Sequence, residues 1–184
     1  MSDLPQIMDA NLSVSIYTQT AFPWLSLIVL LPILGALVMH LLPQQESKSS
    51  NLPRNIALIV LLADFFIIVL AFANLFDPKS ESLQLIERLQ WLPSIGLEWS
   101  LGVDGISAPL VVLSGLITFL SAAASWKVKQ KTRLYFALLL IQASAQALVF
   151  LSQDFLLFFL AWELELVPVY LLIAIWGGKR KLYA

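Results

Sequence analysis

Long apolar runs alternate with short polar connections along this chain. Five runs are long enough to cross a bilayer as helices, which takes roughly 20 residues at the helical rise. They lie at about 24–43, 55–76, 106–126, 134–151 and 155–176. A segment in lipid must satisfy its own backbone polar groups, so such runs predict helices. The pattern predicts an all-α membrane protein: a polar N-terminal segment (1–23), a transmembrane helical domain (24–176) and a basic cytoplasmic tail (177–184).

The long connection over residues 77–104 differs from the short ones. It mixes acidic residues with Trp91, Pro93 and Trp99, and its second half alternates loosely between apolar and polar positions. Tryptophan is enriched at membrane interfaces, and paired strands can be stabilised by packing on helix ends. We therefore expect an ordered interfacial loop that leaves room for a short hairpin.

Basic residues collect in alternate connections, which predicts how the chain is oriented. One set follows the first, third and fifth runs, and a smaller set lies in the other connections. The first set is Lys48, Arg54, Lys127, Lys129, Lys131, Arg133, Lys179, Arg180 and Lys181, and the second is Lys79 and Arg88. Short cytoplasmic loops are enriched in Lys and Arg. This predicts an N-terminus in the lumen or periplasm and a C-terminus in the cytoplasm.

The amino-acid composition supports a membrane protein and argues against several classes of binding site. The chain is 59% hydrophobic and 12% charged, about half the charged share of a soluble domain, so its natural solvent is a lipid bilayer. A net charge of −1 with scattered basic residues argues against a nucleic-acid partner. With no cysteine and one histidine, the sequence offers no thiolate metal site and no iron–sulfur ligands, so any redox centre must lie elsewhere. Acidic Asp3 and Asp9 near the start are not typical of a cleaved signal peptide.

Three carboxylates fall within the apolar runs: Asp64, Glu163 and Glu165. A charged side chain at helix-centre depth costs roughly 2.5–3.5 kcal/mol on insertion scales. An acidic residue that a membrane helix keeps in spite of this cost therefore usually has a function. Glu163 and Glu165 are two positions apart, about 200° of helix rotation, and must face different sides. Pro168 cannot donate to the Leu164 carbonyl, which leaves an acceptor free between the two acids.

The candidates differ in the role expected of them. For Glu163 a protonatable functional group is favoured over a buried acid that ties helices together. For Glu165 the two interpretations are balanced. Asp64, about two turns into its run, is a second-rank candidate, for which a hydrogen bond to a neighbouring helix or a reach toward the interface is favoured. Hydroxyl and amide side chains on the third and fourth runs predict interhelical bonds, with a hydration path as the alternative: Ser114, Thr118, Ser121, Gln142, Ser144 and Gln146.

Two motifs carry a family resemblance that spans most of the chain. The segment from Asp154, which contains WELELVPVYLL, resembles the fifth helix of the antiporter-like subunits of respiratory complex I. VDGISAPLVVL from Val103 is similar to the opening of the third helix of those subunits. Within them, the sequence most resembles the chain 4 type of cyanobacterial and plastid NAD(P)H-quinone oxidoreductases. The matching position for the family's functional acid is Glu163, and Glu165 matches a second acid of the chain 4 type.

The resemblance implies a proton-translocating subunit without a cofactor of its own. Partner subunits would pass electrons from NAD(P)H or ferredoxin to plastoquinone or another quinone. Other membrane subunits of the complex would be the direct partners, in a thylakoid or bacterial inner membrane. Family members continue into further helices that bear the lysine partners of the glutamate, so the resemblance implies a fragment, a truncated product or one part of a split subunit. Two alternatives stay open: a subunit of a multi-subunit Na⁺/H⁺ antiporter, and a purely structural, non-pumping piece.

Overall fold

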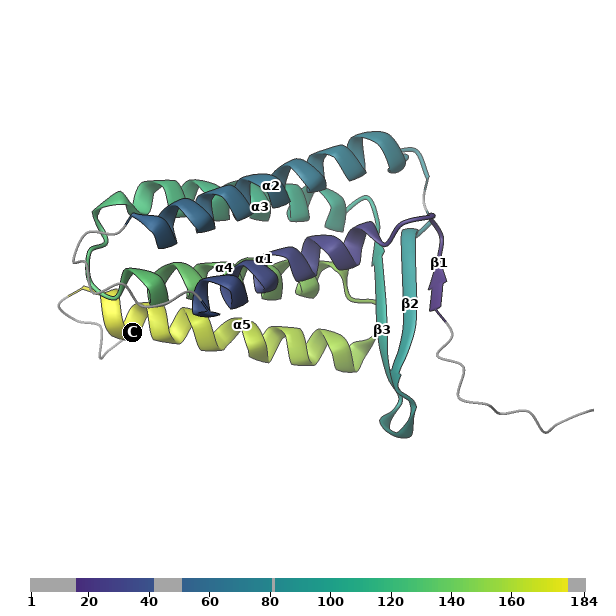
Figure 1. Ribbon diagram of the computed structural model, residues 1–184. Helices are drawn as coiled ribbons and strands as arrows, with labels where there is room; N and C mark the ends of the chain where they lie inside the picture. The colour runs from purple at the N-terminus through teal and green to yellow at the C-terminus, as the bar shows by residue number, and fades with distance from the viewer. Residues whose placement is uncertain (1–15, 42–50, 81, 179–184) are drawn as a thin grey trace, which may run out of the picture.

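Five helices and a three-stranded sheet make up the fold in the computed structural model, which describes residues 16–41, 51–80 and 82–178 (Figure 1). The helices are α1 (Trp24–Leu41), α2 (Leu52–Leu75), α3 (Ser107–Ala124), α4 (Thr132–Leu151) and α5 (Phe155–Trp176). The strands are β1 (Ile16–Thr18), β2 (Gln84–Leu92) and β3 (Leu97–Val103). Two 3₁₀ turns complete the order, η1 (Pro93–Ile95) before β3 and η2 (Ser125–Lys127) after α3.

The five predicted helices are confirmed, and each is long and apolar enough to cross a membrane. Their ends differ from the predicted bounds for local reasons. α2 begins at Leu52 rather than 55, because Pro53 sits in the first turn, where its missing N–H breaks no helical bond. α3 gives way to η2 at Ser125, and α4 begins at Thr132 rather than 134. Most of the polar N-terminal segment and most of the basic tail lie outside the described residues.

The hairpin within residues 77–104 is confirmed as an antiparallel pair of β2 and β3, with Leu89 opposite Trp99. Its turn uses Gly96 in the left-handed region, at φ 71°, where a residue without Cβ is favoured. The sequence did not predict β1, which pairs antiparallel with β2 and extends the hairpin to three strands. Three strands resting on helix ends are stable where an isolated hairpin is marginal.

The sheet covers one end of the helices, and the C-terminus of the described chain lies at the other (Figure 1). Acidic side chains at this sheet end hold the first turns of two helices. Asp104 Oδ1 accepts from the Ile106 and Ser107 amides at 3.0 and 2.7 Å, and Asp154 accepts from the Leu157 amide at 2.7 Å. The amide of Gln153 donates to the Ser100 carbonyl at 2.8 Å, which ties the α4–α5 turn to β3. Asp104 and Asp154 therefore supply hydrogen-bond acceptors to amides at the start of α3 and α5.

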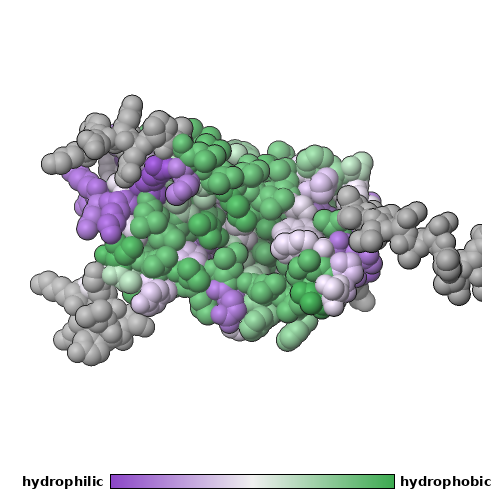
Figure 2. All heavy atoms as spheres, turned by 60° about the horizontal axis from the view of Figure 1, so that its bottom comes forward, coloured by the Kyte–Doolittle hydropathy of each residue, from purple (hydrophilic) through white to green (hydrophobic). Residues whose placement is uncertain are grey.

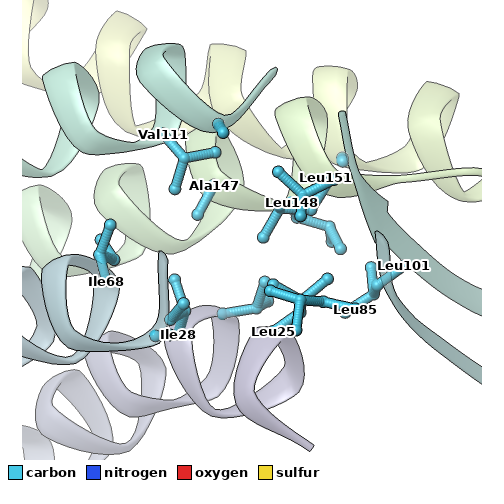
Figure 3. Packing of buried hydrophobic residues seen from close by; sticks show 14 of the residues in the cluster. Leu25, Ile28, Ile68, Leu85, Leu101, Val111, Ala147, Leu148 and Leu151 are labelled. Atoms are coloured by element: carbon cyan, nitrogen blue, oxygen red, sulfur yellow. The ribbon is translucent and has the colours of Figure 1, made fainter. Parts of the chain in front are cut away.

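Two apolar clusters make the core. The cluster nearer the sheet joins all five helices to β2 and β3, and its labelled members converge in Figure 3. The second cluster, toward the other end, contains Met39, Leu61, Phe136 and Leu140. α4 lies at the centre of the arrangement and packs against the other four helices, whereas α5 packs chiefly on α4 and β3.

The outer surface matches a bilayer rather than water. Large apolar side chains are exposed along the outer faces of the helices, including Leu34, Phe66 and Leu120. On the side of the molecule turned forward in Figure 2, hydrophobic residues cover the middle, and hydrophilic residues gather toward the two ends, apart from one small spot. An apolar surface of this extent has no stable counterpart in a soluble monomer, so it faces lipid or other membrane helices.

Candidate functional site

The two carboxylates of α5 face different sides, as their spacing predicts. Glu163 lies on the exposed side of α5 and makes no hydrogen bond to any other described residue. Glu165 is half-buried, and its Oε1 accepts a hydrogen bond from Gln142 Nε2 on α4 at 3.0 Å. Pro168 is buried one turn further on, inside the helix. Glu165 therefore lies against a polar side chain of α4, whereas Glu163 lies on the outer surface of α5, at the middle of an apolar helix.

The polar side chains of α4 bond in three directions. Ser144 Oγ donates to the Val29 carbonyl of α1, and Gln146 Oε1 accepts from Ser114 Oγ of α3 at 2.7 Å. Gln142 reaches α5, as described above, but its own Oε1 is buried with no partner among the described residues. Ser144, Ser114 and Gln146 thus act as interhelical ties, while Gln142 retains an unused acceptor beside Glu165.

Asp64 lies deeper than the sequence suggested. It occupies the middle of the 24-residue α2 and is 5% exposed, so the predicted reach toward the interface is wrong. The error follows from the start of α2, which lies a turn earlier than expected. Its Oδ1 is buried with no hydrogen-bond partner among the described residues. Within the described part of the chain, the favoured hydrogen bond to a neighbouring helix is therefore not made by that oxygen, and Asp64 is separate from the α5 acids.

Glu87 is a buried acid that sequence reasoning missed. It points from β2 to the first turn of α1 and is 3% exposed. Oε1 accepts from the Leu25 amide at 2.7 Å, and Oε2 accepts from the amide and hydroxyl of Ser26 at 2.9 and 2.6 Å. Trp99 Nε1 donates to the same hydroxyl at 2.9 Å. We call this arrangement the Glu87 clamp. In the sequence Glu87 resembles the other acids of the 77–104 connection, and only the structure shows that it lies on the buried side of β2.

The pKa of Glu87 reflects two opposing effects. Burial raises the pKa above its ordinary value of 4.5, and the hydrogen bonds from Ser26 and Leu25 oppose that rise without cancelling it. A carboxyl group that accepts hydrogen bonds from two backbone amides at a helix N-terminus has a structural role. It supplies the acceptors that the amides of the first turn lack within the helix. The clamp therefore anchors α1 to the sheet.

Charge divides the two ends of the molecule. At the end opposite the sheet the described charged residues are all basic: Arg54, Lys127, Lys129, Lys131 and Arg133. The Arg54 guanidinium carbon lies 3.5 Å from the centroid of the Trp126 ring, a cation–π contact. The described sheet end carries Asp77, Glu87, Glu98, Asp104 and Asp154 against Lys79 and Arg88. Across the described residues, no three His, Cys, Asp or Glu side chains form a group that could hold a metal ion.

The helices, the apolar surface and the acids at membrane depth define a multi-pass integral membrane protein. A sequence model of the family NADH-ubiquinone oxidoreductase chain 4, amino terminus, matches residues 27–152. The chain is 52% identical over 163 residues to NAD(P)H-quinone oxidoreductase chain 4 3 of Picosynechococcus sp., covering 89% of this chain and 29% of that protein. It is 52% identical over 167 residues to chain 4 of Prochlorococcus marinus, covering 90% and 30%. The chain belongs to the NADH-ubiquinone oxidoreductase chain 4 family.

Solved structures support the same fold. Respiratory complex I from Thermus thermophilus with bound NADH contains a chain that matches with a TM-score of 0.70 at 24% identity, over 86% of this chain and 30% of that chain. A chain of the membrane-bound sulfane sulfur reductase, an archaeal respiratory membrane complex, matches with a TM-score of 0.64 at 17% identity, over 82% and 23%. The family model and the curated relatives confirm the family resemblance drawn from the two motifs. The chain spans about three tenths of the length of the curated relatives it matches.

Proposed function

We propose that the chain forms part of a proton-translocating membrane subunit of an NAD(P)H- or ferredoxin-dependent quinone oxidoreductase, with Glu163 as its protonatable group. One observation carries the proposal: Glu163 stands at the middle of an apolar membrane helix without a hydrogen bond inside the described chain. An ionised acid there is costly, by roughly 2.5–3.5 kcal/mol on insertion scales, unless it is protonated or meets a cation. Such a group changes its charge when a cationic partner approaches or withdraws.

The partner of Glu163 must come from outside α5. That helix contains no Lys or Arg, and Glu163 points away from α4. A side chain directed straight into acyl chains could not exchange protons, so the mechanism requires a polar neighbour from another helix of the complete subunit or from a second subunit. The exposed apolar side chains of α5, among them Trp162, Leu166 and Tyr170, offer the packing surface that such a helix needs.

Glu165 and Gln142 extend the proposed path toward α4. Because Glu165 is half-buried and faces Gln142 of α4, it is the better placed of the two acids to exchange a proton with the inside of the bundle. The free Gln142 Oε1 beside it is an acceptor for a water molecule. Glu165 is therefore the inner acid and Glu163 the outer acid of the proposed pair.

The charge asymmetry supports an orientation for this path. The basic end would lie in the cytoplasm, and the acidic sheet end in the lumen or periplasm. The cyanobacterial relatives support a thylakoid membrane as the location. Quinone and NAD(P)H or ferredoxin would be used by partner subunits of the complex, and this chain would hold no cofactor.

Glu163→Gln in the intact complex tests the proposal. We expect the rate of proton translocation to fall about tenfold, equivalent to about 1.4 kcal/mol in the barrier, because glutamine keeps the shape but cannot carry the proton. Acidification of membrane vesicles and quinone reduction would be followed together. Glu98→Gln, which removes an acid from β3 outside the helices, is the matched control and should leave both unchanged. Normal pumping and normal quinone reduction in Glu163→Gln would exclude the assigned role.

A further inference from the structure

A layer of polar side chains separates the two apolar clusters of the core. On α2, Asp64 lies between Leu61 of one cluster and Ile68 of the other, in the same buried stripe. Ser114 and Thr118 of α3 and Ser144 of α4 are also buried, and Gln146 of α4 is half-buried. We call Asp64, Ser114, Thr118, Ser144 and Gln146 the polar layer. Each apolar cluster contains residues of α1, α2, α3 and α4, so the layer lies within the bundle, away from its ends.

The level of Asp64 relative to α3 follows from Gly115. A Cβ on Gly115 would lie 2.9 Å from Ile68 Cδ1 and 3.5 Å from Phe65 Cδ2, so α3 crosses α2 closely at this height. α2 runs toward the sheet and α3 runs away from it (Figure 1). One turn along α3 from Gly115 is Thr118, and one turn back along α2 from Ile68 is Asp64. Thr118 and Asp64 therefore share a level.

Hydroxyl and amide groups continue the layer across the bundle. Thr118 Oγ1 donates to the Ser114 carbonyl at 2.9 Å, and Ser114 Oγ donates to Gln146 at 2.7 Å. On the α1 side, Ser144 reaches the Val29 carbonyl, one turn before buried Pro32. These groups can each donate or accept, so they can hold water molecules in line with the unpartnered Oδ1 of Asp64.

Among the described residues, no cation faces Asp64 from the helices around it. On α1 the only titratable residue is His40 in the last turn, and α3 has none. α4 carries Arg133 and Tyr135 only in its first turn, and on α2 itself Arg54 lies in the first turn, about 15 Å away at the helical rise. An ionised carboxylate in the layer would thus be buried without a counter-charge, whereas a protonated carboxyl gains a donor for its neighbours.

We infer that Asp64 is a second proton-binding acid, held protonated in the polar layer and able to exchange its proton with water there. In the exchange, the carboxyl O–H bond breaks as the proton passes to a water molecule, and the reverse step restores it. The protonated state follows from burial and the missing counter-charge. The role of the exchange in pumping rests on the proposed function, and it adds a site on α2 apart from the acids of α5.

Asp64→Asn in the intact complex is the test, with two measurements. Infrared difference spectroscopy should show loss of one protonated-carboxyl C=O band, whereas Glu98→Gln should remove only carboxylate bands. Proton translocation per electron should fall about tenfold in Asp64→Asn with quinone reduction retained. Loss of a carboxylate band in place of a protonated one, or normal pumping in Asp64→Asn, would overturn the inference. If Asp64→Asn fails to assemble, Asp64→Glu should assemble and pump, and an assembled but non-pumping Asp64→Glu would count against it.

The outcomes separate this inference from the proposed function. Normal pumping in Glu163→Gln alongside the lost band in Asp64→Asn would refute the role of Glu163 and leave the protonated acid on α2 in place. Impaired pumping in Glu163→Gln with normal pumping in Asp64→Asn would refute the inference alone.

Discussion

The Glu87 clamp gives a prediction whose size can be worked from its contacts. Glu87→Ala removes the acceptor of the Leu25 and Ser26 amides and of the Ser26 hydroxyl. Hydrogen bonds to a charged group contribute about 1.5–3 kcal/mol each, and losing a helix cap costs about 0.5–2 kcal/mol. Relief of the buried charge and entry of water offset part of this loss. We expect the free energy of local opening at the start of α1 to fall by about 2–4 kcal/mol.

Amide hydrogen exchange of the α1 segment measures that opening. A loss of about 2–4 kcal/mol accelerates exchange of the Leu25 and Ser26 amides by roughly thirtyfold to several hundredfold. Glu87→Gln retains one acceptor and should fall between the wild type and Glu87→Ala. Glu98→Ala, on the neighbouring strand, should leave these amides unchanged. Unchanged exchange in Glu87→Ala would show that water or other groups replace the carboxyl group without loss, and the clamp would have no energetic role.

Two further predictions concern the same clamp and the polar layer. Because burial raises the pKa of Glu87, ionising this carboxyl group costs more in the folded than in the unfolded state. The stability of wild type relative to Glu87→Gln should therefore be greatest below pH 4.5 and decline as the pH rises through the folded-state pKa; a flat difference in amide exchange across this range would contradict the prediction. Ser114→Ala should destabilise the helical bundle by about 0.6 kcal/mol through loss of the bond to Gln146, measured by unfolding in mixed micelles, and a stabilised variant would show that the bond is strained.

The location of an acid is easier to predict than its surroundings, as α5 shows. The spacing of Glu163 and Glu165 was enough to place them on different faces. It did not say which face met α4, because α5 is apolar all round and both lipid and helix neighbours accept apolar side chains. Only the packing of α5 on α4 assigns Gln142 to Glu165 and leaves Glu163 outward.

By itself the sequence determined the five helices, because in lipid the length of an apolar run decides whether it spans and the backbone then has to be helical. It allowed the hairpin without requiring it, and the family followed from the resemblance of two motifs. The tertiary structure decided the depth and isolation of Asp64, the addition of β1 to the sheet and the burial of Glu87 against α1. Each of these depends on contacts between segments far apart along the chain, and no local pattern of polar and apolar residues encodes such contacts.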